Sequence, residues 1–346
     1  MATASAVCQV SLIEPMEALL AEKLPDGRGW QFEPKWDGFR CIAVREGEAV
    51  ELWSKSGKPL GRYFPEIEAM FGRLKTRRFV IDGELLISSP GAIAFDALQL
   101  RLHPAASRVS KLAAETPAMF MAFDCLALGK EMLAAKSLAD RRAALEQLLA
   151  KESEPMLLLS PATNDRGRAV DWLKRSGGAL DGVIAKRLDQ PYRPGERAMV
   201  KVKQRRTADC VIGGFRYGKN DRLVASLLLG LYDDAGLLHH VGFTSSIAAK
   251  DRPGWTKELE KIVKAPGFTG NAPGGPSRWS TERSSQWEPL KPKLVVEVQY
   301  DHVTGGRFRH GTRFVRWRPD KLPRQCTMDQ LQREGRPSRL IREMRL

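Results

Sequence analysis

The segment Glu33-Pro-Lys-Trp-Asp-Gly-Phe-Arg40 contains a lysine in a setting that suits nucleophilic chemistry. An acid, Asp37, stands two residues after Lys35, and Gly38 adjoins that acid. A lysine becomes a nucleophile when desolvation or a nearby cation depresses its pKa from about 10.4 toward neutrality. An Asp-Gly step favours a tight turn, which lets the backbone approach a ligand closely. Alone, Lys-x-Asp-Gly is more often a solvated hairpin turn, so the residues that follow must decide.

Two further Asp-Gly steps could place acidic groups beside a ligand. Asp82-Gly83-Glu84 lies between two short apolar runs, and Asp181-Gly182 precedes a third. Both steps are compatible with plain hairpin turns. In the functional alternative, Glu84 projects from a strand edge to accept a ribose hydroxyl or to hold a water of a bound metal ion.

An aromatic residue and two sets of cations complete the candidate chemistry. Phe123-Asp124 lies in an apolar run and is either core or an aromatic face that stacks on a base. Lys201 and Lys203 alternate along an expected strand and therefore project to one face, either as guards of an exposed edge or as a phosphate clamp. Arg316-Trp-Arg-Pro-Asp-Lys321 follows another expected strand, in the basic C-terminal part.

The helical and strand-like apolar patterns around these residues predict an α+β domain over residues 1–205. Glu66–Leu74 and Leu138–Leu149 show helical apolar stripes, and Ser137 can cap the second of these helices. Val170–Leu173 belongs to a third, shorter helix. The runs expected as strands are Cys41–Val44, Val50–Trp53, Phe79–Ile81, Leu85–Ile87, Met119–Phe123, Val183–Lys186 and Met199–Val202.

After Arg206 the pattern changes to strands separated by turns, which predicts a five-stranded OB-fold barrel over residues 206–346. Ile247–Val263 is expected as an inserted helix. Pro266–Pro289 is rich in Gly, Pro and Ser and is expected as a loop, which carries Arg278, Trp279 and Trp287. The expected strands are Val211–Phe215, Val224–Tyr232, Leu237–Phe243, Leu294–Tyr300 and Arg313–Trp317.

The charge of the chain points to a polyanionic partner. Of 346 residues, 56 are Lys or Arg and 41 are Asp or Glu, which gives a formal charge of +15 and a pI near 9.8. Residues 301–346 alone carry twelve basic and five acidic residues, or +7, and such clustering favours nucleic acid. No apolar run reaches the ~18 residues of a membrane span, and no signal peptide is evident, so we expect a cytoplasmic, nucleoid-associated protein.

The five cysteines indicate neither a zinc site nor a disulfide framework, because none forms a Cys-x-x-Cys pair. Cys41, Cys125 and Cys210 lie in apolar runs and are expected to be buried thiols.

The order of these motifs resembles that of the covalent nucleotidyltransferase superfamily. It is most similar to the bacterial ATP-dependent DNA ligases of the short two-domain type, the ligase C branch and the ligase domain of ligase D. Six motifs in register, from about Ile13 to Lys321, carry the resemblance. It implies an adenylating nucleotidyltransferase domain followed by an OB-fold. It also implies ATP and Mg²⁺ as cofactors, and nick sealing in DNA repair through a lysyl-AMP intermediate.

The resemblance also implies partners. The substrate would be nicked double-stranded DNA with 5′-phosphate and 3′-hydroxyl ends. A repair polymerase or an end-binding factor is a further candidate partner, and the protein would act as a monomer without a membrane.

For the nucleotide, the resemblance assigns one role to each motif. Lys35 would attack the α-phosphate of ATP, Glu33 would face the adenine amino group, and Phe123 would stack on the ring. Arg40 and Glu84 would contact the ribose. The candidate catalytic residues are Lys35, Asp37, Lys201, Lys203, Arg318, Asp320 and Lys321. The candidate nucleotide-binding residues are Glu33, Lys35, Arg40, Glu84, Phe123, Asp181, Arg197, Lys201 and Lys203, with Glu84 and Asp181 as metal candidates.

For the phosphates, the resemblance assigns Arg197 to the phosphate side and Lys201 with Lys203 to a clamp on the α-phosphate. Arg318, Asp320 and Lys321 would orient the pyrophosphate leaving group.

Two positions depart from the family pattern. Ser54-Lys55-Ser56-Gly57 stands where the family has Ser-Arg-x-Gly, so Lys55 keeps the charge but loses the bidentate fork that would hold the 5′-phosphate of the nick. Asp181 stands where many relatives carry Glu, and a water could bridge the missing methylene to Mg²⁺.

Other functions share part of this pattern. An mRNA-capping guanylyltransferase has the lysine turn, the acidic turn and the barrel, and would use GTP instead of ATP. A non-catalytic DNA-binding module would need only the basic surface. An RNA ligase often lacks the barrel, and an NAD-dependent ligase is disfavoured because the chain has no four-cysteine zinc cluster.

Overall fold

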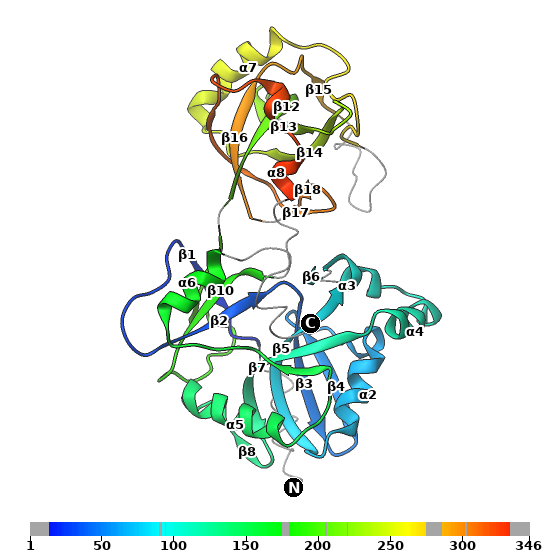
Figure 1. Cartoon of the computed structure of the whole chain (residues 1–346), viewed down its shortest axis with the longest axis vertical. Coiled ribbons are helices and arrows are strands. Elements are labelled where there is room, and N and C mark those ends of the chain that lie inside the picture. Colours follow the sequence, from blue (N-terminus) through cyan, green and yellow to red (C-terminus); the bar gives the residue numbers. More distant parts are fainter. Residues whose placement is uncertain are drawn as a thin grey trace. The chain divides into compact units, whose positions relative to one another are not determined.

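The computed structural model describes residues 14–89, 92–93, 95–174, 180–204, 206–219, 221–274, 286–301 and 303–332. Ile13, Arg278, Trp279 and the basic tail beyond residue 332 lie outside the described residues. The described chain divides into two compact units, one within residues 1–204 and one within residues 205–335 (Figure 1). Each unit is described by itself.

The larger sheet of the first unit carries Arg40, Glu84 and Phe123. Its strands run in the order β4-β3-β5-β7-β8, with β6 paired to β5 and β9 paired in parallel to β7. The bounds are β3 Phe39–Glu46, β4 Ala49–Ser54, β5 Arg78–Ser89, β6 Ala92–Ile93, β7 Ala118–Leu128, β8 Glu131–Met132 and β9 Leu157–Leu159.

Helices cover this sheet with the apolar stripes that the sequence predicts. The helix α2, Pro65–Arg73, buries Ile67, Met70 and Phe71 in the same cluster as Phe79 and Phe120 of the sheet. Ser137 accepts a hydrogen bond from the Asp140 amide, at 3.2 Å, which caps α5, and α5 packs against β7. The remaining helical segments are η1 Gly61–Tyr63, α3 Phe95–Arg101, α4 Ala106–Glu115, α5 Leu138–Ala150 and α6 Arg166–Lys174.

A second, four-stranded sheet carries the candidate nucleophile. Its order is β1-β11-β10-β2, with bounds β1 Ala18–Ala21, β2 Trp30–Trp36, β10 Leu180–Arg187 and β11 Met199–Val202. Asp37-Gly38 links β2 of this sheet to β3 of the larger one. A Cβ on Gly38 would lie 2.2 Å from the backbone oxygen of Leu85, so only glycine lets the chain cross so close to β5. Lys35 therefore lies where the two sheets meet.

The other two Asp-Gly steps are not hairpin turns, and that alternative is wrong for both. Asp82-Gly83-Glu84 lies inside the single strand β5, which joins the two strands expected on either side. A Cβ on Gly83 would lie 2.3 Å from the ring of Phe120, so this glycine serves close packing. Gly182 follows a bulge in β10 with φ of 144°, and a Cβ there would lie 2.1 Å from the backbone oxygen of Val202.

The second unit is a closed five-stranded barrel with an OB-fold, as predicted. Its strand order is β14-β13-β12-β16-β19, and Thr244 at the end of β14 pairs with Thr312 just before β19, which closes the sheet. The bounds are β12 Arg206–Tyr217, β13 Val224–Tyr232, β14 Leu238–Thr244, β16 Val295–Tyr300 and β19 Arg313–Trp317. Short strands β15 Glu288–Pro289, β17 Val303–Thr304 and β18 Arg307–Phe308 accompany them.

The helix inserted in the barrel is shorter than the expected Ile247–Val263. It consists of η2 Ala249–Asp251 and α7 Arg252–Glu260, with a proline in the first turn of α7, a position where its missing N–H costs nothing. The described part of the loop 266–289 includes Trp287, whose ring lies 5.5 Å from that of Phe268. Its aromatic ring is thus packed against the barrel. After the barrel, η4 Pro323–Gln325 and α8 Asp329–Gln332 complete the described chain.

The cysteines Cys41, Cys125 and Cys210 are fully buried and free, as predicted, and Cys326 is also buried. Among the described residues, no helix is both long and apolar enough to cross a membrane.

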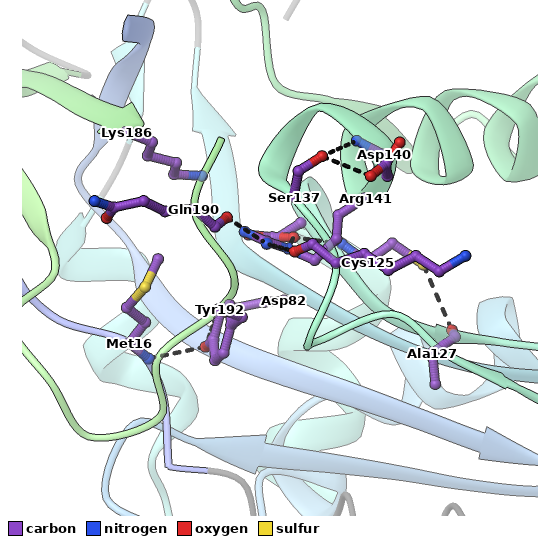
Figure 2. A network of polar contacts seen from close by, with 12 residues as sticks. Met16, Asp82, Cys125, Ala127, Ser137, Asp140, Arg141, Lys186, Gln190 and Tyr192 are labelled. Carbon is purple, nitrogen blue, oxygen red and sulfur yellow. Dashed lines mark hydrogen bonds and ion pairs between the residues drawn. The ribbon is translucent and has the colours of Figure 1, made fainter. Parts of the chain in front are cut away.

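A buried ion pair ties α5 to the larger sheet. Arg141 on α5 donates from Nε and a terminal nitrogen to the two carboxylate oxygens of Asp124 on β7, at 2.8 and 3.1 Å. It also donates to the backbone oxygens of Lys136 and Gln190, as Figure 2 shows for the residues around Arg141. Both charged side chains are 1% exposed.

We expect Arg141→Leu to lower the free energy of unfolding of the full chain by about 3–5 kcal/mol, because Asp124 would remain as an uncompensated buried charge. Urea denaturation measures the change. Lys111→Ala is the control, since Lys111 and Glu115 form an exposed pair at 3.7 Å and should contribute about 0.5 kcal/mol or less. Equal effects of the two substitutions would contradict the prediction.

Candidate active site

A cavity of about 1100 Å³ in the first unit lies over the junction of the two sheets. Of the residues predicted from sequence, six line it: Glu33, Lys35, Arg40, Glu84, Phe123 and Lys201. They come from β2, β3, β5, β7 and β11, so the fold brings together side chains that are far apart in the sequence. The volume and the mixture of cations, two acids and an aromatic face suit a nucleotide.

The amine of Lys35 forms an ion pair that the sequence did not predict. Its Nζ lies 2.6 Å from one carboxylate oxygen of Asp181, and the Nζ of Lys203 lies 3.1 Å from the other. Burial alone would raise the pKa of Asp181, but the charges of Lys35 and Lys203 outweigh it, and the pKa is lowered. Asp181 therefore stays ionised between two ammonium groups.

Lys201 contributes a third ammonium group to the same region. Burial lowers the pKa of Lys201, and the charges of Lys35 and Lys203 lower it further. Lys201 and Lys203 thus act on one neighbourhood, as their alternation along the chain predicted. Three cations surround one carboxylate, so the cluster has an excess of positive charge and can bind a further anion.

Arg40 lies at the centre of a hydrogen-bond network that includes Met16 and Tyr192. Sequence reasoning missed both of these residues. Its guanidinium donates to both carboxylate oxygens of Asp82, at 3.0 and 2.6 Å, and to the backbone oxygen of Met16, at 2.6 Å. The hydroxyl of Tyr192 donates to Asp82 at 2.8 Å and accepts from the Met16 amide at 2.9 Å (Figure 2). Burial would lower the pKa of Arg40, but Asp82 raises it well above its usual value. The network fixes Arg40 at the cavity wall.

The carboxylate of Glu33 is held by hydrogen bonds from two side chains, one on β2 and one on β10. Its carboxylate accepts from Nε2 of Gln31 at 2.7 Å and from Nζ of Lys186 at 2.9 Å. Lys186 also lies 4.7 Å from the centroid of the Phe123 ring. Gln31 precedes Glu33 by two residues on β2, so the period of a strand was the signal that could have found it. The two partners fix the direction of this buried carboxylate.

Glu84 is the better of the two metal candidates. Burial raises the pKa of Glu84 to about 7, against the opposing charges of Lys35 and Arg40. The carboxylate accepts a hydrogen bond from the Gly38 amide at 3.2 Å and lines the cavity, whereas both oxygens of Asp181 are engaged by lysines. The described residues contain no cluster of three or more His, Cys, Asp or Glu that could hold a metal ion. One or two carboxylates nevertheless suit Mg²⁺, which binds largely through substrate phosphates and water.

Two cations predicted to contact phosphate share one acid at the cavity edge. Lys55 and Arg197 lie 2.8 and 3.7 Å from the two carboxylate oxygens of Glu17. Lys55 and Glu17 line the cavity. Arg197 is not among the lining residues, and its side chain is 70% exposed. Asp37 does not line the cavity either, so its catalytic role stays a prediction.

Arg318, Asp320 and Lys321 belong to the second unit and follow β19. Arg318 donates from Nε and a terminal nitrogen to Asp320, at 3.0 and 2.9 Å, and from the other terminal nitrogen to Asp209, at 2.8 Å. Lys321 donates to the second oxygen of Asp209 at 2.6 Å. Asp209 on β12 was missed in the sequence, where nothing distinguishes it from an exposed strand residue. The three residues form one charged cluster with it.

Comparison with known proteins agrees with this architecture. The family model described as ATP dependent DNA ligase domain matches residues 12–203, and the model of the ATP dependent DNA ligase C terminal region matches residues 220–321. DNA ligase C1 of Mycolicibacterium smegmatis is 45% identical over 330 residues and covers 92% of this chain and 93% of its own length. DNA ligase C of Mycobacterium tuberculosis is 40% identical over 346 residues, or 94% and 96% of the two chains.

A solved structure from a study of Lig E DNA ligases has a TM-score of 0.54 with this chain at 18% identity. It covers 88% of this chain and 100% of the solved one, and it supports the fold alone. A nucleotidyltransferase domain that bears a cavity with an internal lysine, followed by an OB-fold, is the architecture of the covalent nucleotidyltransferases, which include the nucleotide-dependent ligases. The chain belongs to the ATP-dependent DNA ligases. Its nucleotide is ATP, and Mg²⁺ is the standard cofactor of the family.

The raised pKa of Glu84 predicts a stability that depends on pH in the absence of nucleotide. Because the pKa is about 7 in the folded chain and 4.5 ordinarily, the folded state holds a proton that the unfolded state loses as pH rises from 4.5 to 7. Stability therefore falls across this range. We expect Glu84→Gln to be more stable than the wild type by about 3 kcal/mol at pH 8 and nearly equally stable near pH 4.5.

Urea denaturation without Mg²⁺ at the two pH values measures this difference. Glu258→Gln, at an exposed pair with Lys261, is the control. A difference between Glu84→Gln and the wild type that did not change with pH would contradict the prediction.

Proposed function

We propose that this ligase seals 5′-phosphate/3′-hydroxyl nicks in double-stranded DNA during repair, and that Lys35 carries AMP between the steps. The observation that carries the proposal is the position of Lys35. Its amine lies in a nucleotide-sized cavity beside Lys201, with Glu33 and Phe123 in the same wall. A lysine amine is a nucleophile that can attack phosphorus, and the neighbouring cation can neutralise phosphate charge.

The proposed nucleotide position follows the residues that line the cavity. Glu33, fixed by Gln31 and Lys186, accepts a hydrogen bond from the adenine amino group. Phe123 stacks on the ring, and Arg40 and Glu84 contact the ribose. A buried carboxylate whose oxygens accept hydrogen bonds offers no donor to the O6 of guanine at the same position, so this arrangement favours ATP over GTP.

The first step requires that Lys35 leaves Asp181. The ion pair is made by the ammonium form of Lys35, which has no lone pair for attack. Asp181 is a poor proton acceptor because its pKa is lowered, so the proton passes to solvent. The neutral amine then forms a bond from nitrogen to the α-phosphorus. The bond from that phosphorus to the bridging oxygen breaks, and pyrophosphate leaves with the electron pair.

Charge neutralisation supports this transfer from several sides. Lys201 and Lys203 clamp the α-phosphate, so they replace the charge lost when Lys35 becomes neutral. Glu84, with Asp181 as the second candidate, would hold Mg²⁺ together with phosphate oxygens and water. The bound metal would neutralise phosphate charge. Asp37 would keep the turn that directs Lys35 into the cavity.

The second and third steps use DNA. The 5′-phosphate of the nick attacks the AMP phosphorus, which breaks the bond to Lys35 and restores its amine. The 3′-hydroxyl then attacks the 5′-phosphorus, a phosphodiester forms, and AMP leaves. Lys55 and Arg197 are positioned at the cavity side to hold the 5′-phosphate once it displaces Glu17.

We further propose that residues 1–205 act as the adenylation domain and residues 206–346 as the OB-fold domain. In the first step, Arg318, Asp320 and Lys321 of the barrel orient the pyrophosphate. The net charge of +15 supports a DNA duplex as the partner. The protein would work as a monomer in the cytoplasm, associated with the nucleoid, with a repair polymerase or an end-binding factor as additional partners.

We expect Lys35→Ala to abolish the covalent adduct. The protein is incubated with α-labelled ATP and Mg²⁺, followed by a nicked duplex, and intact-mass spectrometry detects AMP on the chain. Lys130→Ala, in the exposed turn between β7 and β8, is the matched control and should be labelled as the wild type is. Labelling of Lys35→Ala at the wild-type level would refute the assignment, and labelling by GTP instead of ATP would favour a capping-type guanylyltransferase.

We expect Lys186→Met to reduce the preference for ATP over GTP on the order of tenfold, because Glu33 would lose the cation that fixes and balances its charge. The measurement is the ratio of labelling rates with the two nucleotides. Arg187→Met, at the next position on β10 but paired with Asp189 at the surface, is the control. An unchanged ratio in Lys186→Met would count against the proposed role of Glu33.

A further inference from the structure

Two carboxylates of the barrel lie directly opposite each other on neighbouring strands. Asp209 on β12 is the cross-strand partner of Glu297 on β16. Their side chains are only 13% and 16% exposed. Like charges at directly opposed positions destabilise a sheet, so this pair persists only because cations compensate it.

The compensating cations include the residues assigned above to the pyrophosphate. Arg318 lies between the two acids, with one terminal nitrogen 2.8 Å from Asp209 and 3.9 Å from Glu297. Lys321 lies 2.6 Å from the other oxygen of Asp209. Arg316 pairs with Glu297 at 2.7 Å. Asp209 therefore uses one oxygen for each of two cations and sets the separation between them.

The position of Asp209 is itself fixed by the fold. Its backbone amide donates to Oε1 of Gln330 at 3.0 Å, and its backbone oxygen accepts from Nε2 of the same residue at 3.1 Å. Gln330 lies on α8, which follows Lys321 in the sequence. A helix after Arg318 and Lys321 therefore fixes the strand residue that binds both of them. Such a doubly anchored carboxylate is a rigid reference point.

Each of the three nitrogens of Arg318 makes a hydrogen bond within its own unit. Its three nitrogens donate to Asp209 and Asp320, which makes Arg318 a bridge from the buried acid to the acid at the surface. Lys321 uses one of its three N–H groups on Asp209 and can direct the others outward. Lys321 can therefore meet a phosphate without breaking the bridge.

We propose that Asp209 is a positioning residue for the adenylation step, because it holds Arg318 and Lys321 at the spacing in which Lys321 meets the pyrophosphate leaving group. The inference rests on the proposed role of the barrel in that step. Without the carboxylate, the two cations repel each other and Lys321 loses its anchor. The third step releases AMP and involves no pyrophosphate, so it does not depend on this geometry.

The test separates the two steps in the full-length protein. Asp209→Asn removes the charge and keeps the size of the side chain. We expect the single-turnover rate of Lys35 adenylation with ATP and Mg²⁺ to fall tenfold to a hundredfold, on the order expected for misplaced groups. Sealing of a nicked duplex that already carries AMP on its 5′-phosphate should stay within about twofold of the wild type. Asp233→Asn, which pairs with His239 in the same unit, is the matched control and should change neither rate.

Three results would overturn the inference. Adenylation by Asp209→Asn at the wild-type rate would show that the carboxylate positions nothing. An equal loss in both steps, together with a lower melting temperature, would assign Asp209 a purely structural role. If Asp209→Asn does not fold, Asp209→Glu, which keeps the charge but moves it by one methylene, must still slow adenylation and spare sealing, and failure to do so refutes the proposal.

Lys321→Ala distinguishes failure of this inference from failure of the proposed function. If adenylation is slow in Lys321→Ala but proceeds at the wild-type rate in Asp209→Asn, only the proposed role of Asp209 is refuted. A normal adenylation rate in Lys321→Ala would remove the proposed role of the barrel itself, and the inference with it.

Discussion

The ion pair between Lys35 and Asp181 is the interaction on which the site depends. The contact at 2.6 Å ties the amine of the candidate nucleophile to a carboxylate, at the junction of two sheets. Lys35 comes from β2 and Asp181 from β10, and the two strands pair with each other, so the distance is set by the register of one ladder. The bulge at Gly182 is part of the same constraint, because it turns Asp181 toward Lys35 where a regular strand would not. Activation of the lysine must therefore begin with a change of charge around Asp181.

The same arrangement recurs at the other groups assigned to phosphate. Asp181 bridges Lys35 and Lys203, Glu17 bridges Lys55 and Arg197, and Asp209 bridges Arg318 and Lys321. In each case one carboxylate offers one oxygen to each of two cations. A phosphate carries several oxygens and more negative charge, so it can take over both cations at once. The carboxylates thus keep the cations paired and correctly spaced until a phosphate replaces them.

Much of this organisation could be predicted from sequence, because it depends on local patterns. The bounds predicted for β13 and β19 are those of the structure, and the cap at Ser137 located the start of α5. The Asp-Gly steps at Asp82 and Asp181 stayed open between two alternatives in the sequence, because the same dipeptide serves a turn or a close packing contact. At Gly83 only the ring of Phe120, brought in from another strand, distinguishes the two.

The partners of the site residues lay beyond sequence reasoning for a related reason. Asp209 and Tyr192 sit in no recognisable motif, and their roles follow from contacts across more than a hundred residues of sequence. Lys186 lies at the end of a strand that was predicted. No sequence pattern, however, indicates that its amine pairs with Glu33 instead of facing solvent. Such pairings depend on the register between strands, which a single sequence does not specify.

Burial orders the three bridging carboxylates by how readily a phosphate can displace them. The side chain of Glu17 is 31% exposed, that of Asp209 is 13% exposed, and that of Asp181 is 10% exposed. Exposed ion pairs contribute little free energy, whereas buried ones are costly to separate unless a new charge replaces the old. Lys55 is therefore released at small cost, which offsets the loss of the arginine fork at this position. Lys35 is released only when a strongly charged ligand fills the cavity, and this makes the nucleophile dependent on its substrate.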